Sequence, residues 1–192
     1  MSKKITIIDY GMGNLYSVQN ALRSIGAEPV VTSDAEVIAN AEKILLPGVG
    51  AFGDCMANLE KSGLIPVIMD SLHSGKPFLG ICLGMQLLFE GSDEAPGVKG
   101  LGFFKGQVRL LHTELKIPHM GWNKLELRSP STLLEGAEGE YVYFVHSFHA
   151  EPEDRSIITS VCDYGMEVTA SVGRGKVQAF QFHPEKSSRV GM

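Results

Sequence analysis

The 192-residue sequence lacks several features that would assign it to a specialised class of protein. No apolar run approaches the roughly 20 residues that span a bilayer, and residues 1–4 do not begin a signal-peptide pattern. Cysteine is scarce: the three residues Cys55, Cys82 and Cys162 are an odd number at wide spacings, which argues against a disulfide framework and against a Cys-based zinc site. We therefore expect a cytoplasmic protein with free thiols and no contact with a membrane.

The sequence also has fewer positively than negatively charged residues. Lys and Arg together number 17 against 22 Asp and Glu, a formal net charge of −5, so we expect no nucleic-acid partner. The six histidines show no helical His-x-x-x-His spacing, and the glycine-rich segments lack the lysine of a nucleotide phosphate loop. The sequence thus predicts neither a metal nor a cofactor.

What remains is an ordinary globular composition, with 44% hydrophobic residues, in a length that suits one domain over residues 1–192. The first half alternates short β-branched runs with helical patterns, which predicts a mostly parallel sheet flanked by helices. The second half has short strands divided by turns, which predicts an antiparallel extension of that sheet. Expected strands are 4–9, 28–32, 43–46, 77–82, 107–111, 124–127, 141–145, 156–162, 167–172 and 177–181, with helices near 15–25, 52–61 and 64–72.

The most informative stretch is Gly80-Ile81-Cys82-Leu83-Gly84, which follows an apolar run and precedes a helical pattern. Glycines two positions either side of a nucleophile allow the sharp strand-to-helix turn of a nucleophile elbow. Cys82 would then stand at the end of the sheet and at the beginning of a helix, where a thiolate is favoured. The plain alternative is a buried cysteine in a tight turn.

A base for such a nucleophile is found at the far end of the chain. His183 and Glu185 follow an apolar strand pattern, and a turn at Pro184 would bring the carboxylate onto the imidazole. A cysteine nucleophile needs a base, and that base needs an acceptor to fix its orientation. Taken alone, the pair also fits two surface polar residues.

A third element is Pro47-Gly48-Val49-Gly50 after another strand. Such a loop can present backbone N–H groups to a developing oxyanion, and the N–H of Leu83 beside the nucleophile can supply a second donor. A simple strand-to-helix turn is the alternative.

These elements together resemble the class I (triad) glutamine amidotransferases. Closer features resemble one branch of that family, the glutaminase subunits of imidazole glycerol phosphate synthase, and they cover nearly the whole chain in order. The segments that carry this likeness are residues 9–14, 47–53, 80–88, 95–102, 118–123 and 182–187, with Pro-His-Met-Gly-Trp-Asn at 118–123 rather specific to the branch.

The resemblance implies the fold of class I glutamine amidotransferases and hydrolysis of L-glutamine to glutamate and ammonia through a thioester. Cys82 would be the nucleophile, His183 the general base and then acid, and Glu185 its orienting partner, with Val49 and Leu83 forming the oxyanion hole. The residues expected to hold glutamine are Gly50, Gln86, Glu94, Ser147 and Phe148. Glu94 also fits a solvated acid, and Phe148 stands where relatives often have tyrosine, so no tyrosine hydroxyl acts there.

The same resemblance implies a heterodimer with a (β/α)₈ cyclase barrel that receives the ammonia and makes imidazole glycerol phosphate in histidine biosynthesis. Asn14, Trp122, Tyr143 and Lys186 match interface positions, although the single tryptophan also fits a core aromatic. In similar proteins the oxyanion strand around Val49 is poorly arranged until the partner binds its ligand. Alternatives are the glutaminase of another synthase, such as one for surface-sugar amidation, a free-standing cysteine γ-glutamyl hydrolase, and an inactive binding module.

Overall fold

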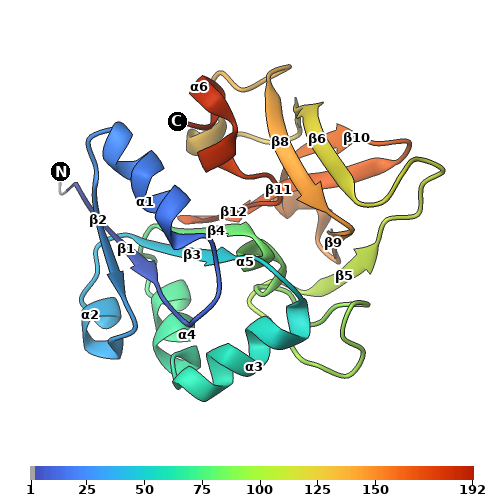
Figure 1. Ribbon diagram of the computed structural model, residues 1–192. Coiled ribbons are helices and arrows are strands. Elements are labelled where there is room, and N and C mark those ends of the chain that lie inside the picture. The colour runs from blue at the N-terminus through green and yellow to red at the C-terminus, as the bar shows by residue number, and fades with distance from the viewer. Residues whose placement is uncertain (1–2) are drawn as a thin grey trace.

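A computed structural model describes residues 3–192 and is built around an eight-stranded mixed sheet (Figure 1). The strand order is β2-β1-β3-β4-β12-β11-β10-β7. The strands from β2 to β12 in that order run parallel, and β11, β10 and β7 continue the sheet antiparallel. The bounds are β1 (Lys4–Ile8), β2 (Glu28–Thr32), β3 (Ile44–Gly48), β4 (Phe78–Cys82), β7 (Glu126–Leu127), β10 (Ile158–Asp163), β11 (Glu167–Arg174) and β12 (Val177–Phe180). The predicted α/β fold with a mixed, mostly parallel sheet is confirmed.

Helices cover both faces of the parallel part of the sheet. In Figure 1, α2, α3 and α4 lie below the sheet and α1 lies above it. Within residues 3–192 no helix has the length and apolar character needed to cross a membrane. The bounds are α1 (Leu15–Ser24), α2 (Ala35–Ala39), α3 (Phe52–Ser62), α4 (Ile65–His73), α5 (Leu83–Gln86) and α6 (Ser188–Gly191).

The central strands are apolar throughout because helices bury them on both faces. Successive residues of a strand point to opposite faces, so Ile8 and Leu46 join the core under α3 and α4, whereas Ile7 and Leu45 join the core under α1. Every residue of β3 is buried. This double burial fixes β3 and β4 as a rigid platform for the residues at their carboxyl ends.

The second half of the chain departs from the prediction of one continuous extension. Two pairs of strands form separate two-stranded sheets, β5 with β9 and β6 with β8. The strand expected at 124–127 is divided between two strands: Lys124 is the last residue of β6, and the short β7 covers only Glu126–Leu127. Residues 155–157 form a 3₁₀ turn, so the strand expected from 156 begins at Ile158. The bounds are β5 (Gly106–Leu110), β6 (His119–Lys124), β8 (Tyr141–His146) and β9 (Phe148–Pro152).

Candidate active site

The carboxyl ends of β3, β4 and β12 meet at one edge of the sheet, where Gly48 pairs with Cys82. This is the edge at which open α/β sheets bind their ligands. A pocket of about 340 Å³ opens there. Ten of the residues expected to form the site line this pocket: Val49, Gly50, Cys82, Leu83, Gln86, Glu94, Ser147, Phe148, His183 and Lys186.

Cys82 occupies a sharp turn between β4 and α5. Its backbone has φ 54° and ψ −111°, a conformation that side-chain-bearing residues rarely adopt. The turn closes only because its flanking positions are glycines: a Cβ on Gly80 would lie 2.8 Å from the carbonyl oxygen of Gly84, and a Cβ on Gly84 would clash with the carbonyl of Leu46. The predicted elbow is therefore present, but the expected helix is a single turn, Leu83–Gln86, so its dipole contributes little to a thiolate.

His183 and Glu185 form the buried pair that the sequence predicts. Nδ1 of His183 lies 2.7 Å from Oε1 of Glu185, and both side chains are 3% exposed. Burial lowers the pKa of His183, but its contacts with Cys82 and Glu185 outweigh burial and raise the pKa to about 9. The other carboxylate oxygen of Glu185 is buried and has no hydrogen-bond partner among residues 3–192. No second donor there competes with the imidazole for the negative charge of the carboxylate.

Two buried side chains donate hydrogen bonds to the backbone of the segment Pro47–Gly50. The hydroxyl of Tyr10 donates to the carbonyl of Pro47 at 2.9 Å, and Sγ of Cys55 donates to the carbonyl of Val49 at 3.5 Å. Burial raises the pKa of both groups, so both stay protonated at neutral pH. Gly50 has φ 99°, which suits glycine. Val49 thus lies beside Cys82 on an anchored loop, and its N–H as an oxyanion donor stays a prediction.

The residues expected to hold glutamine line two sides of the pocket. Gln86 is 3% exposed and donates both amide hydrogens to protein acceptors, Phe148 O and Gln181 Oε1, each at 3.0 Å. Only its carbonyl oxygen is left for a ligand. Glu94 is exposed and accepts from the N–H of Phe52 at 2.8 Å, which ties the acid to the beginning of α3. Ser147 joins β8 to β9 opposite them.

Three residues near the site were missed by sequence reasoning. Gln181 is fully buried and places Nε2 at 3.8 Å from Sγ of Cys82. His119 and His146 are buried and bonded to each other, with Nδ1 of His119 at 3.0 Å from Nε2 of His146. The available signal for Gln181 was a lone amide between two phenylalanines of an apolar strand. For the two histidines, the only signal in the sequence was a polar side chain within a segment that contains aromatic residues.

Of the four residues expected at a partner interface, Lys186 lines the pocket, whereas Asn14, Trp122 and Tyr143 lie outside it. Trp122 is 52% exposed and meets the ring of Tyr143 edge to face, with centroids 6.1 Å apart. Nζ of Lys186 lies 5.8 Å from the centre of the Tyr143 ring. Asn14 instead caps α1 by accepting from the N–H of Ser17 at 3.3 Å. Trp122 is therefore an exposed aromatic and not a core residue.

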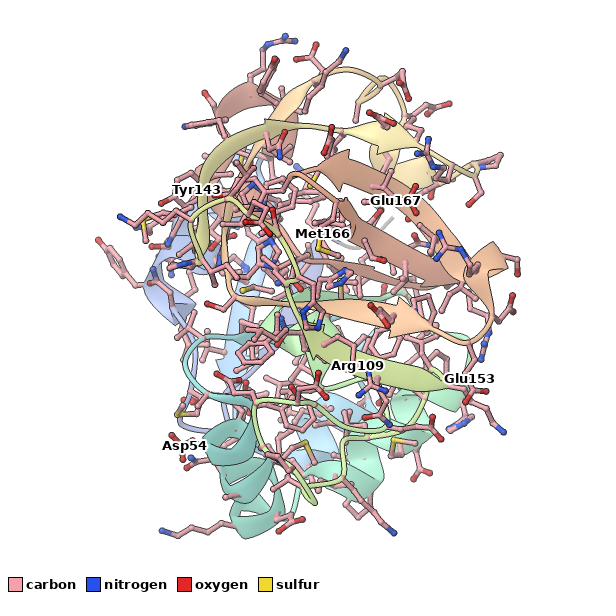
Figure 2. All side chains as sticks on the ribbon, turned by 90° about the vertical axis from the view of Figure 1, so that its right-hand side faces the viewer. Asp54, Arg109, Tyr143, Glu153, Met166 and Glu167 are labelled. Carbon is pink, nitrogen blue, oxygen red and sulfur yellow. The ribbon has the colours of Figure 1, made fainter. Side chains whose placement is uncertain are left out.

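A second hollow, of about 390 Å³, lies on the face shown in Figure 2, where Arg109, Glu153, Met166 and Glu167 are labelled around it. Its arginines are already paired, Arg109 with Asp93 at 2.8 Å and Arg155 with Glu167 at 2.5 Å. These surface ion pairs leave no concentrated charge for a ligand. Within residues 3–192, no group of three or more His, Cys, Asp or Glu side chains could hold a metal ion.

Comparison with known proteins assigns this arrangement to a class. The family model of glutamine amidotransferase class-I matches residues 6–191. A crystal structure of a glutamine amidotransferase superposes with a TM-score of 0.75 at 19% identity, covering 94% of this chain and 90% of that one. The structure of PurLQS from Thermotoga maritima gives 0.73 at 22% identity, with 96% and 89% covered. The chain belongs to the class-I glutamine amidotransferase family.

Within that family, the similarity is much higher to one kind of subunit. The chain is 51% identical to the imidazole glycerol phosphate synthase subunit HisH of Methanothermobacter thermautotrophicus, over 98% of this chain and 93% of that protein. It is 52% identical to the subunit of the same name from Aquifex aeolicus, over 98% and 92%, and 50% identical to that of Geobacter sulfurreducens, over 98% and 94%. The resemblance to this branch of amidotransferase enzymes, predicted from the sequence, is confirmed.

Proposed function

We propose that this protein is the glutaminase subunit of an imidazole glycerol phosphate synthase and hydrolyses L-glutamine to L-glutamate and ammonia. The observation that carries the proposal is the pocket in which Cys82 and His183 meet, with Glu185 bonded behind the imidazole. A thiol, a base and an orienting carboxylate are what nucleophilic acyl transfer requires.

In the proposed reaction, Sγ of Cys82 attacks the side-chain amide carbon of glutamine while His183, whose raised pKa keeps the imidazole protonated at neutral pH, holds the proton that came from the thiol. The N–H groups of Val49 and Leu83 stabilise the oxyanion of the tetrahedral intermediate. The intermediate collapses to a γ-glutamyl thioester, and His183 returns its proton to the leaving nitrogen, which departs as ammonia. Water, deprotonated by His183, then attacks the thioester and releases glutamate and the Cys82 thiol.

Glutamine would be held by opposite sides of the pocket. Glu94 offers a carboxylate to the α-ammonium group, a charge-assisted contact that is stronger than a neutral one. Gly50 and the Ser147–Phe148 backbone offer peptide groups, and Gln86 offers its remaining carbonyl oxygen. The N–H of Phe52 that Glu94 accepts from is a neutral donor, so this contact leaves the carboxylate available to a cation.

The proposed partner is the (β/α)₈ cyclase barrel of the synthase, which would use the ammonia to make imidazole glycerol phosphate and AICAR in histidine biosynthesis. The curated relatives are named as subunits of that synthase, which supports a heterodimeric assembly. We propose that residues 1–192 act as one domain in the cytoplasm, in line with the buried free thiols Cys55, Cys82 and Cys162.

The test is glutamate release from glutamine by the purified chain, alone and after addition of a cyclase barrel with its ribonucleotide ligand. We expect low activity alone and a strong rise with the liganded barrel. High activity without a partner would identify a free-standing hydrolase instead. No activity under either condition would contradict the proposal in favour of another synthase or an inactive module.

Cys82→Ala and Cys82→Ser are the matched variants for that assay. Both should abolish glutamate release and leave the affinity for the cyclase barrel unchanged, because Cys82 is only 8% exposed and lies inside the pocket. A folded Cys82→Ala protein that loses partner binding together with activity would contradict this division of roles.

A further inference from the structure

A series of hydrogen bonds, here called the relay, crosses the β6–β8 sheet from Asn123 through His119 and His146 and ends beside the pocket at Phe148. His119 and His146 lie directly opposite each other in the antiparallel register, 3.0 Å apart at Nδ1 and Nε2. Nδ1 of His146 lies 2.8 Å from the carbonyl oxygen of Phe148. At the other end, the amide nitrogen of Asn123 lies 3.3 Å from Nε2 of His119.

The groups at the two ends of this series of hydrogen bonds determine which atom donates and which accepts in each of them. A carbonyl oxygen only accepts, so Nδ1 of His146 must carry a hydrogen, and in the neutral ring Nε2 must then accept. Nδ1 of His119 is therefore the donor, which leaves Nε2 to accept from Asn123. The Asn123 amide is oriented independently, because it donates to Asp163 O at 2.8 Å and its oxygen accepts from Lys124 N at 2.7 Å.

Both rings are held neutral and fixed in place. Burial lowers the pKa of His119 to about 4, and burial, opposed by the bond to Phe148, lowers that of His146 to about 3. The His119 ring is stacked between Tyr164 and Phe144, with centroids 3.9 Å and 4.7 Å away. Such packing restricts rotation of the ring, so Nδ1 and Nε2 of His119 keep their positions toward His146 and Asn123.

This series of hydrogen bonds ends on the carbonyl of Phe148, a residue that lines the pocket. The Phe148 carbonyl accepts from His146 and also from Nε2 of Gln86 at 3.0 Å, so two side chains from different elements fix its direction. Gln86 in turn is bonded to Gln181, whose amide lies against Sγ of Cys82. Because a peptide unit is planar, fixing this carbonyl fixes the Phe148–His149 peptide plane, including the Cα atom of Phe148, and so restricts where Phe148 and the preceding Ser147 lie in the pocket lining.

We propose that His119 and His146 are positioning residues for glutamine: their hydrogen-bond relay fixes the Phe148 carbonyl, and with it the position of Phe148 next to Ser147 in the wall of the pocket that receives the substrate. The proposal rests on the function proposed above. It assigns the inner face of β6 to substrate positioning, whereas Met120 and Trp122 on the same strand point outward and are 62% and 52% exposed.

The first test reads the relay itself and needs no activity. In protein labelled with ¹⁵N-histidine at pH 7, long-range ¹H–¹⁵N spectra should show both rings neutral with the hydrogen on Nδ1, and His119→Asn and His146→Asn assign the signals. A charged ring, or a hydrogen on Nε2 of either ring, would overturn the proposal.

The second test separates positioning from a merely structural role. With the liganded barrel present, His146→Leu should raise KM for glutamine about tenfold or more, with kcat changed less than about threefold, since one directed hydrogen bond is lost. His146→Asn retains an amide donor near the position of Nδ1 and should bring KM back to within about threefold of the wild type. His119→Leu should raise KM less than His146→Leu.

His73→Asn, on the exposed end of α4, is the matched control and should change neither constant. Equal effects of His146→Leu and His146→Asn, or a fall in kcat at constant KM, would overturn the proposal. If the wild-type protein fails to hydrolyse glutamine at all, the proposed function fails, and the tautomer spectra still decide whether the relay exists. The same spectra decide the case if His146→Leu does not fold.

Discussion

Among single residues, His183 combines a catalytic position with an unusual protonation equilibrium. Its pKa is raised to about 9 from an ordinary value of 6.5, because contacts with Cys82 and Glu185 outweigh burial. A raised pKa means that the folded protein holds the proton more tightly than the unfolded chain. The stabilisation is therefore complete below pH 6.5 and is lost as the pH rises through about 9.

We predict a corresponding loss of stability in alkaline solution. At about 1.4 kcal/mol per pH unit, the change from 6.5 to about 9 corresponds to roughly 3 kcal/mol of unfolding free energy at most. Urea unfolding at pH 6.5 and pH 9.5 measures it. Glu185→Gln removes one of the two contacts that raise the pKa, so its pH dependence should be clearly smaller than that of the wild type. Identical pH dependence in the two proteins would show that the pair does not hold the proton.

Glu185→Gln also tests what the carboxylate does in the reaction. The substitution keeps the size of the side chain but removes the charge that orients and stabilises the imidazolium. We predict that kcat falls by roughly 10³- to 10⁴-fold, against roughly 10⁶-fold for Cys82→Ala or His183→Ala. Steady-state kinetics with the liganded partner would measure the three variants side by side. Equal losses would mean that Glu185 does more than orient its neighbour.

At the scale of elements, the elbow between β4 and α5 depends on how closely it packs against β3. A Cβ on Gly84 would clash with the carbonyl of Leu46, and a Cβ on Gly48 would lie 2.7 Å from the nitrogen of Gly84. The obstruction is backbone in both cases, so relief of the first clash requires a shift of β3 and relief of the second requires a shift of the elbow itself.

We therefore predict that Gly84→Ala destabilises the protein by about 3 kcal/mol or more, a large value for one added methyl group. Gly63→Ala is the matched control: Gly63 has φ 69° at the end of α3, but nothing lies within 4 Å of its Cβ position. That variant should lose only about 1 kcal/mol, the cost of the left-handed backbone. Urea midpoints compare the two, and similar losses would contradict the packing argument.

The elements also differ in how well the sequence predicts them. The strands β2 and β4 have apolar or β-branched runs bounded by clear turns, and they lie close to their predicted limits. Strands β6 and β9 were missed because His119–Lys124 and Phe148–Pro152 mix polar, glycine and proline residues, and they become strands only through pairing with β8 and β5. Local pattern cannot encode such a tertiary pairing.

The same distinction holds for the candidate site. Cys82, His183 and Glu185 could be predicted because each has a local signature: a glycine-flanked turn or a His-x-Glu at the end of a strand. Gln181 could not be, because its contact with Cys82 joins residues 99 positions apart. The glutamine-binding and interface residues came only from the family resemblance, since no spacing rule relates Glu94 to Ser147.

For the molecule as a whole, the two-stranded β6–β8 sheet contributes both to the pocket and to the surface that exposes Trp122. Tyr143 lies on β8 opposite Trp122, and the backbone carbonyl of Tyr143 accepts from the N–H of His183 at 2.9 Å. A partner bound over Trp122 and Tyr143 would therefore press on the strand that holds the base in place. This arrangement offers a direct mechanical connection between assembly and the proposed chemistry.

Trp122 is the residue on which that assembly should depend. An exposed tryptophan contributes little to the fold but much to an interface in which it becomes buried, so Trp122→Ala should weaken binding to the cyclase barrel by about 30-fold or more. The urea midpoint of the isolated variant should stay near that of the wild type, because the side chain is 52% exposed. Calorimetric titration with the barrel measures the affinity. The control is Val37→Ala, which changes an exposed apolar residue on α2, far from β6 and β8 in Figure 1, and should bind normally. Normal binding by Trp122→Ala would exclude this surface as the interface, whereas a shared loss of binding and stability would show that the tryptophan supports the β6–β8 sheet itself.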